Sequence, residues 1–326
     1  VGSEMCIRDR VKCTELNLWY KIQKRTLQGR RTGVGTTAEG DMIAALGLRY
    51  GTEEATDFSE KVHRSLALAA YRSSVSMAKE RGAFSIFDAG REVDNPFINR
   101  LKKEDEELYR DMCKYGRRNI ACLTIAPTGT TSLMTQTTSG IEPVFMPVYR
   151  RRRKVNPNDP EVRIDYVDET GDAFEEYVVY HHKFITWMQV NGIEVKENYT
   201  QEEVDALVAR SPYYKATAND IDWLQKVRMQ GRIQRWVDHS ISVTINLPSD
   251  VSEEMVGQLY VEAWRSGCKG CTVYRDGSRS GVLISAKKEE KKPVAAINQP
   301  AETLVRPIAV SYTHLRAHET KAHLVC

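Results

Sequence analysis

The sequence lacks the features that would place the protein in a membrane or outside the cell. No apolar run reaches the roughly 20 residues that a membrane-spanning helix needs, and the first residues lack the apolar stretch of a secretory signal. The seven cysteines form no even framework of spacings, which fits reduced thiols in the cytosol better than a disulfide scaffold. We therefore expect a cytoplasmic protein that contacts no membrane.

The sequence also has little excess charge of either sign. Its 47 basic and 44 acidic residues leave a formal net charge of +3, which is too small to indicate nucleic-acid binding. The strongest basic run, Arg150–Lys154, contains no aromatic residue that could stack on bases, and a turn-rich segment follows it. We interpret the run as a solvated loop, with a polyanion site as the alternative, and we expect no DNA or RNA partner.

What the chain does have is enough apolar residues for a substantial core. Hydrophobic residues make up 41% of its 326 positions, which suits one large domain or two small ones. Between Arg30 and about Arg279, short apolar runs alternate with stretches of helical periodicity. That alternation is typical of an α/β domain.

Both ends of the chain differ from the rest. Residues 1–10 and 311–326 resemble peptides that arise when sequencing-adapter DNA is translated, so we predict that they are not native. Residues 286–310 are poor in large apolar side chains, which predicts a linker. The last segment holds side chains that mimic a zinc site, but because the segment resembles adapter sequence we predict no metal there: His314, His318, His323 and Cys326.

Local signals predict the following helices and strands. The longest helix has apolar positions from Phe58 to Ala70 and ends near Gly82. Asn119–Ala126 is an apolar run of strand length that ends before a proline, as a buried parallel strand would. The remaining predictions are a helix from Thr131, a helix through Trp223 and Trp236 capped by Asn219 or Asp220, a strand at 240–246, a helix from Ser252 to near Gly267, and a strand at 271–274 closed by a turn at 276–277.

The most informative motif is Ala126–Ser132, where the predicted strand is followed by a helix. Free backbone N–H groups at a helix start, together with side-chain hydroxyls, form an anion site of phosphate size. We predict that the small residues of this motif bind a ligand's phosphate: Thr128, Gly129, Thr130, Thr131 and Ser132. A capped helix without a ligand is the alternative. A nucleotide-hydrolysing P-loop is disfavoured, because no lysine follows the glycine.

Longer segments around this motif resemble the large subunit of ribonucleotide reductases. The resemblance rests on Arg118–Thr130 followed by Ser139–Pro143, and it continues in family order over residues 19–285 through Arg30–Gly35, Ala45–Tyr50, His239–Asn246 and Gly267–Arg279. It implies that residues 19–285 form the second half of a ten-stranded α/β barrel of the ribonucleotide reductase and glycyl-radical enzyme type. It also implies that the Thr128–Ser132 loop holds the substrate's phosphates, in agreement with the local argument.

The resemblance implies a reaction as well. Members of the family reduce the ribose 2′ carbon of ribonucleotides, which supplies deoxyribonucleotides for DNA synthesis, by means of a cysteine radical and a dithiol. It therefore implies a ribonucleotide substrate, a thioredoxin-like reductant and a possible homodimer. The radical cysteine and its neighbouring Asn and Glu should lie upstream of this chain, so we assign no catalytic residue and expect this fragment alone to be inactive.

One motif bears on the source of the radical. Family members that depend on a separate metal-containing subunit have two adjacent tyrosines near the last barrel strand, whereas this chain reads Val273-Tyr274. The chain therefore resembles the adenosylcobalamin-dependent class, in which the radical comes from the cofactor itself. A subunit-dependent class I reductase is the first alternative, and an inactive, truncated phosphate-binding scaffold is the second.

For one cysteine motif and one glycine motif, we favour a structural role over a functional one. Cys268 and Cys271 form a C-x-x-C pair, but their placement at a helix end and in a strand favours packing over redox or metal chemistry. Gly33–Ala38 fits the loose dinucleotide fingerprint, yet no long buried strand precedes it. We interpret it as a turn of the barrel.

Three further polar residues invite a functional interpretation. His181 and His182 stand next to large aromatic residues, and we predict that they are surface or packing residues and not ligands. Glu142 follows the phosphate motif closely in sequence. We predict that it either orients the loop beside the phosphate site or serves only the fold.

Overall fold

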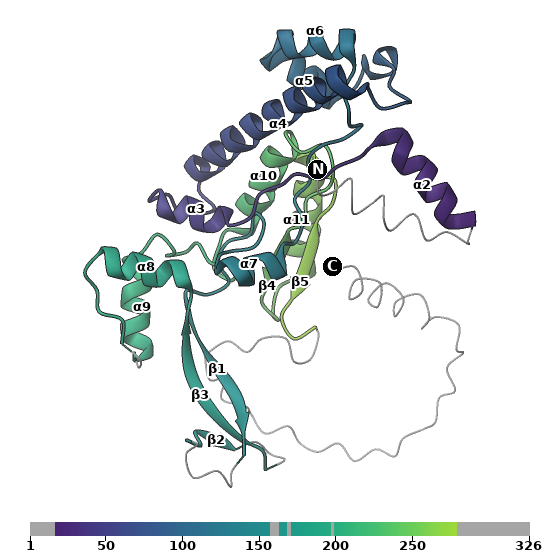
Figure 1. The fold of residues 1–326 in the computed structure, drawn as a ribbon. Coiled ribbons are helices and arrows are strands. Elements are labelled where there is room, and N and C mark those ends of the chain that lie inside the picture. The colour runs from purple at the N-terminus through teal and green to yellow at the C-terminus, as the bar shows by residue number, and fades with distance from the viewer. Residues whose placement is uncertain (1–16, 157–162, 168–170, 197–198, 279–326) are drawn as a thin grey trace. The chain divides into compact units, whose positions relative to one another are not determined.

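The computed structural model describes residues 17–156, 163–167, 171–196 and 199–278 (Figure 1). Helices and short strands alternate along these ranges, as the sequence predicted. None of the described helices is both long enough and apolar enough to cross a membrane. The elements are α2 (Asn17–Gly29), α3 (Glu39–Ala45), α4 (Glu53–Arg81), η1 (Ala89–Glu92), α5 (Pro96–Glu104), α6 (Glu106–Tyr115), α7 (Gly129–Thr135), β1 (Val148–Val155), β2 (Tyr166–Val167), β3 (Ala173–Tyr180), α8 (His182–Val190), α9 (Gln201–Ala209), α10 (Trp223–Gln234), β4 (Thr244–Leu247), α11 (Glu253–Arg265) and β5 (Thr272–Arg275).

Parallel pairing joins four separate parts of the chain. Val34 pairs with Leu123, Ile125 pairs with Ile241, and β4 pairs with β5, all in the parallel direction. Parallel neighbours need long crossovers, and along the chain helices lie between the two members of each of these parallel pairs. The predicted strand at 119–126 is therefore correct in direction and burial, and backbone hydrogen bonds join it to the segments at Val34 and Ser240 on its two sides. The strands that the structure describes do not close into a barrel.

The long helix α4 begins and ends where its local signals predict. Its N-cap residue Thr52 accepts a hydrogen bond from the Ala55 N–H at 3.3 Å, and two glutamates in the first turn complement the helix dipole. At its C-terminal end Gly82 has a φ of 78°, a left-handed conformation that favours glycine. The predicted stop near this glycine is confirmed.

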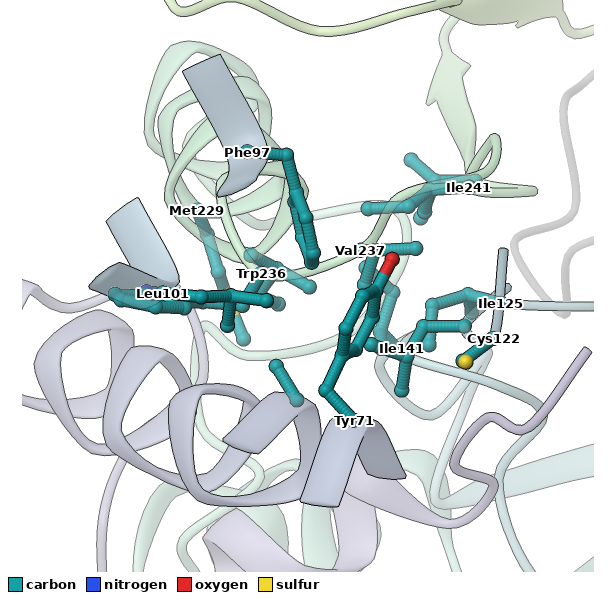
Figure 2. Close-up of a cluster of buried hydrophobic side chains, with 14 of the residues drawn as sticks. Tyr71, Phe97, Leu101, Cys122, Ile125, Ile141, Met229, Trp236, Val237 and Ile241 are labelled. Carbon is teal, nitrogen blue, oxygen red and sulfur yellow. The ribbon is translucent and has the colours of Figure 1, made fainter. Parts of the chain in front are cut away.

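The largest apolar cluster lies between α4, α10 and the parallel strands. Figure 2 shows Tyr71 of α4 in this cluster with its hydroxyl directed toward the strands. That hydroxyl donates to the Asp238 carboxylate at 2.6 Å, and the same carboxylate accepts the N–H groups of Cys122 and Leu123 at 2.8 Å each. Burial and the Asp238 charge raise the pKa of Tyr71 well above its ordinary value. One carboxylate thus joins a helix to a central strand inside the core.

Two predicted helix starts were wrong by a few residues. The N-cap of α10 is Asp222, whose carboxylate accepts from the second and third N–H groups of the helix, and not Asn219 or Asp220. Asp220 instead accepts from the N–H and hydroxyl of Thr217. Helix α10 ends at Gln234, before Trp236, and α7 begins at Gly129, two residues before the predicted start. Ser252 does cap α11, as predicted.

The basic run Arg150–Lys154 was wrongly interpreted as a loop, because it lies within β1. This strand pairs antiparallel with β3 along its whole length, and β2 pairs with the other edge of β3. Cross-strand ion pairs explain how so many cations fit one strand: Arg152 with Glu176 at 2.8 Å, Arg153 with Glu175 at 2.6 Å and Lys154 with Asp172 at 2.5 Å. These pairs neutralise three of the five cations of the run.

The close contact between Gly35 and the Thr124 backbone allows the parallel pairing to be tested. A Cβ at this position would lie 1.9 Å from the carbonyl oxygen of Thr124, so Gly35→Ala must separate the two segments. We expect this change to lower the free energy of unfolding by about 3 kcal/mol, as overpacking of a core does. Urea denaturation measures the effect.

The matched control is Gly257→Ala in the exposed interior of α11, where an added Cβ would meet nothing within 4 Å. It should raise the free energy of unfolding by about 0.5–1 kcal/mol, because alanine is the better helix former. Equal effects of the two substitutions would contradict the close pairing at Gly35.

Candidate functional site

The predicted phosphate loop lies where the buried strand ends and α7 begins. Gly129, Thr130 and Thr131 are exposed. In the described part of the chain, their three N–H groups donate to no acceptor, as expected of the first turn of a helix. The loop therefore presents three free N–H donors and two threonine hydroxyls on one exposed turn.

Thr128 precedes this turn in a conformation that is rare for its residue type. Its φ of 49° and ψ of 26° place a β-branched residue in the left-handed region. Its hydroxyl accepts the Gly140 N–H at 2.7 Å and shares a hydrogen bond of 3.0 Å with the Thr37 hydroxyl. The hydroxyl of Thr128 is thus used to hold the loop.

Ser132, the last of the five predicted residues, is buried. Its hydroxyl donates to the Gly129 carbonyl at 2.8 Å and shares a hydrogen bond of 2.7 Å with the Ser139 hydroxyl. The five residues therefore fall into two groups. Gly129, Thr130 and Thr131 are accessible to a ligand, whereas Thr128 and Ser132 brace the loop from behind.

A second loop, around the start of α3, packs against the segment that follows α7. Asp41 and Thr138 exchange two hydrogen bonds there, with the Thr138 N–H donating to the Asp41 carboxylate at 2.8 Å. The other oxygen of that carboxylate accepts the His181 ring Nε2 at 2.6 Å and the Tyr213 hydroxyl at 3.1 Å. Burial and the Asp41 charge raise the pKa of Tyr213 well above its ordinary value. Asp41 thus links three distant segments beside the phosphate loop.

Sequence reasoning assigned no role to Thr37, which lies inside the Gly33–Ala38 turn, and it did not consider Asp41 or Thr138. The signal that could have found Asp41 is a carboxylate in the first turn of a short helix that follows a glycine-rich turn. His181 was predicted to be a surface or packing residue, and it is mostly buried against Asp41. His182 is exposed.

A buried acid, Glu39 at the first position of α3, lies next to a buried imidazole, His63 of α4. The Nε2 of His63 is 3.4 Å from Glu39 Oε2, and the Thr36 hydroxyl lies 3.3 Å from both atoms. His63 Nδ1 is 2.9 Å from the Ser59 carbonyl, which fixes the orientation of the ring. Burial raises the pKa of Glu39, and the charge of His63 opposes that rise. The pair is sealed in the core beneath α3, so we assign it no contact with a ligand.

The glycine and cysteine motifs lie in packed surroundings. Gly35 is in close contact with Thr124, as a turn next to a strand requires. Cys268 and Cys271 pack against the apolar cluster formed by α10, α11 and the β4–β5 pair. Burial raises the pKa of both thiols, that of Cys268 to about 12. Such thiols stay protonated at neutral pH and make poor nucleophiles.

The tail residues whose spacing mimics a zinc site lie outside the described residues: His314, His318, His323 and Cys326. Within the described ranges, no three His, Cys, Asp or Glu side chains group in a way that could hold a metal ion. The Glu142 N–H donates to the Ser139 carbonyl at 2.8 Å, and the Ser139 hydroxyl in turn shares a hydrogen bond with Ser132 of the phosphate loop.

Comparison with known proteins agrees with the sequence resemblance. Residues 9–274 match the family described as ribonucleotide reductase, barrel domain. A vitamin B12-dependent ribonucleoside-diphosphate reductase of Mycobacterium tuberculosis (strain CDC 1551 / Oshkosh) is 31% identical over 263 residues, which cover 79% of this chain and 33% of that protein. An enzyme of the same description from Thermoplasma acidophilum is 30% identical over 274 residues, which cover 84% of this chain and 32% of that protein.

A solved structure is similar in fold. The alpha subunit of a class Id ribonucleotide reductase from Actinobacillus ureae superposes with a TM-score of 0.56 at 14% identity, over 83% of this chain and 44% of that chain. At this identity the likeness concerns the fold alone. The chain spans about a third of the length of the two curated relatives.

The strained Thr128 generates a test of how the loop is held. Thr128→Val keeps the branched side chain but leaves the buried Gly140 N–H without its acceptor, so it should lower the free energy of unfolding by about 1–3 kcal/mol. Thr128→Ser keeps the hydroxyl and should change this free energy by less than about 0.5 kcal/mol. Thermal and urea unfolding of both variants measure the difference, and a serine variant as unstable as the valine variant would refute the hydroxyl's role.

Proposed function

Because the chain belongs to the ribonucleotide reductase barrel-domain family, we propose that it supplies the part of a reductase active site that anchors the substrate's phosphates. The observation that carries this proposal is the exposed start of α7. Three N–H groups without acceptors and two threonine hydroxyls lie there on one turn. Backbone N–H groups at a helix start favour phosphate oxygens, because the helix dipole places partial positive charge at the same point.

The whole protein, in this proposal, converts ribonucleotides to deoxyribonucleotides. The ribose 2′ hydroxyl leaves as water, hydrogen takes its place, and a dithiol is oxidised to a disulfide. The radical cysteine, with its Asn and Glu, belongs to a part of the protein upstream of this chain. Cys122, the most buried cysteine of the described residues, fits that role poorly, because its side chain is packed in the core and its thiol is inaccessible to a substrate. We therefore propose that this segment by itself is inactive.

We assign the whole protein to the adenosylcobalamin-dependent class. The relatives named above are vitamin B12-dependent reductases, and Val273-Tyr274 lacks the tyrosine pair expected of subunit-dependent enzymes. When bound, the cofactor would supply the initiating radical. The likeness to a class Id subunit is one of fold and does not favour the class I alternative.

We assign no adenosylcobalamin site to the described residues. A cavity of about 670 Å³ lies beside the starts of α4 and α10, and four of its lining side chains are charged: Arg49, Lys215, Asp220 and Asp222. A corrin with its adenosyl group and nucleotide loop is larger than this cavity. The cavity does not fit the cofactor, so we assign no residue of this chain to it.

The remaining parts of the proposal follow from the family. Residues 19–285 would form half of a ten-stranded barrel, with its other strands supplied by the rest of the protein, and residues 286–310 a linker. A ribonucleotide, a thioredoxin-like reductant and a second copy of the protein are the proposed partners. The cytoplasmic location and the non-native origin of residues 1–10 and 311–326 stay predictions.

The phosphate site is tested by removing its hydroxyls in the full-length protein. The double variant Thr130→Val and Thr131→Val should bind cytidine diphosphate at least about 100-fold more weakly, because each hydrogen bond to a charged oxygen contributes about 1.5–3 kcal/mol net and about 1.4 kcal/mol is a factor of 10. Cytidine without phosphate should bind equally to both proteins. Isothermal titration measures the two affinities.

The control is Thr135→Val at the far end of the same helix, where the hydroxyl donates back to the Thr131 carbonyl at 3.0 Å. It should leave both affinities unchanged. If the double variant binds the diphosphate as tightly as the unaltered protein, α7 is a capped helix without a ligand, and the scaffold alternative gains support.

The class is tested by reconstituting turnover of the full-length protein. Deoxyribonucleotide formation should depend on added adenosylcobalamin and a dithiol, and should proceed without a metal-containing partner subunit. Activity that requires such a subunit and ignores the cobalamin would assign the protein to class I. No turnover under either condition would favour the inactive scaffold.

A further inference from the structure

A buried lysine lies behind the phosphate loop without belonging to it. The ammonium of Lys226 on α10 donates to Glu142 Oε2 at 2.6 Å and to the Thr244 carbonyl at 2.6 Å. The Lys226 side chain is 1% exposed. A charged group buried this deeply needs partners of this kind, since an unpaired buried ammonium is strongly unfavourable.

The carboxylate of Glu142 is held from two directions. Its second oxygen, Oε1, accepts the Thr244 N–H at 2.6 Å, while Oε2 accepts the ammonium of Lys226. The carboxylate therefore bridges α10 and the start of β4, and both of its oxygens are engaged. Such charge-assisted bonds are short and directional, so they fix the position of Glu142 relative to the sheet.

Glu142 is the last residue of a short turn, Ser139–Glu142, which we call the bracing turn. The Glu142 N–H closes it by donating to the Ser139 carbonyl at 2.8 Å. The turn touches the phosphate loop at two points. The Gly140 N–H donates to the Thr128 hydroxyl at 2.7 Å, and the Ser139 and Ser132 hydroxyls are 2.7 Å apart.

We propose that Lys226 is a positioning residue for the phosphate loop, acting through Glu142 and the bracing turn. The inference rests on the proposed function of the loop. The Lys226–Glu142 pair anchors one end of the turn to α10 and β4. The other end holds the hydroxyl of Thr128, whose left-handed backbone sets where α7 begins. Lys226 thus sets the position of the loop's N–H donors without touching the ligand.

A buried ion pair suits this role better than an apolar pair would. The desolvation of two charges offsets most of their attraction, so such a pair adds little net stability. What it does provide is a single allowed geometry, because any displacement leaves a charge without its partner. A loop that binds phosphate through backbone groups needs that geometry held to a fraction of an ångström.

Direct electrostatic attraction between Lys226 and the phosphate is the competing explanation, and the two make opposite predictions. Lys226→Met removes a positive charge, whereas Glu142→Gln removes a negative one. If charge alone mattered, the first change would weaken phosphate binding and the second would strengthen it. If positioning matters, both changes loosen the bracing turn and both weaken binding.

The experiment measures the affinity of the full-length protein for cytidine diphosphate and for cytidine, together with the free energy of unfolding. We expect Lys226→Met and Glu142→Gln each to bind the diphosphate about 10-fold to 100-fold more weakly, which is the range expected when a remote change misplaces binding groups. Cytidine binding should not change. The matched control is Arg228→Met on the same helix, which breaks the exposed pair with Glu262 and should leave both affinities unaltered.

A double variant separates positioning from loss of folding. Glu142→Leu with Lys226→Met removes both charges, so it should recover much of the stability that Lys226→Met alone loses, yet its affinity for the diphosphate should stay low because the bracing turn has lost its anchor. Recovery of affinity along with stability would overturn the proposal, and so would tighter binding by Glu142→Gln. If the unaltered protein itself fails to bind the diphosphate, the proposed function of the loop fails, and the positioning role fails with it.

Discussion

The left-handed backbone of Thr128 is the constraint on which the rest of the site depends. This conformation costs an ordinary residue about 1–2 kcal/mol, and more when the side chain is branched, so it persists only where neighbours determine it. The Thr128 hydroxyl meets Gly140 on one side and Thr37 on the other, and these two contacts come from segments far apart in the sequence. Because the chain turns at Thr128, α7 begins there and its first N–H groups stay exposed.

Carboxylates complete the backbone pairing around this point. The central strand exchanges backbone hydrogen bonds with the segments at Val34 and Ser240, while its N–H groups at Cys122 and Leu123 donate to Asp238. In the same way Asp41 accepts the Thr138 N–H and Glu142 accepts the Thr244 N–H. Each carboxylate also forms a hydrogen bond with a side chain of another segment. Asp238 binds Tyr71, Asp41 binds His181 and Glu142 binds Lys226, so each carboxylate holds a loop in a fixed position relative to that segment.

Elements whose ends depend on neighbours in sequence could be predicted, and those that depend on distant partners could not. The caps and terminal glycines of α4 and α11 are local, so both helices were found. Two aspartates lie close to the start of α10, and either could cap the helix. Asp222 is the N-cap, because the carboxylate of Asp220 accepts hydrogen bonds from Thr217. The arginine run became a strand because its acidic partners lie on β3. The phosphate loop was predicted from its motif, but nothing local marks Thr37 or Lys226, which are 91 and 84 residues from their partners in the site.

Binding through backbone N–H groups also determines which residues can tune such a site. A backbone donor is the same for every residue except proline, so side chains on the exposed turn can alter phosphate binding only through Thr130 and Thr131. The position and direction of the N–H groups depend instead on Thr128, Ser132 and the bracing turn behind them. A loop of this kind is therefore specified mainly by residues that never reach the ligand. In the proposed arrangement a lysine buried in α10, with its charge already neutralised, therefore influences phosphate affinity through geometry and not through its charge.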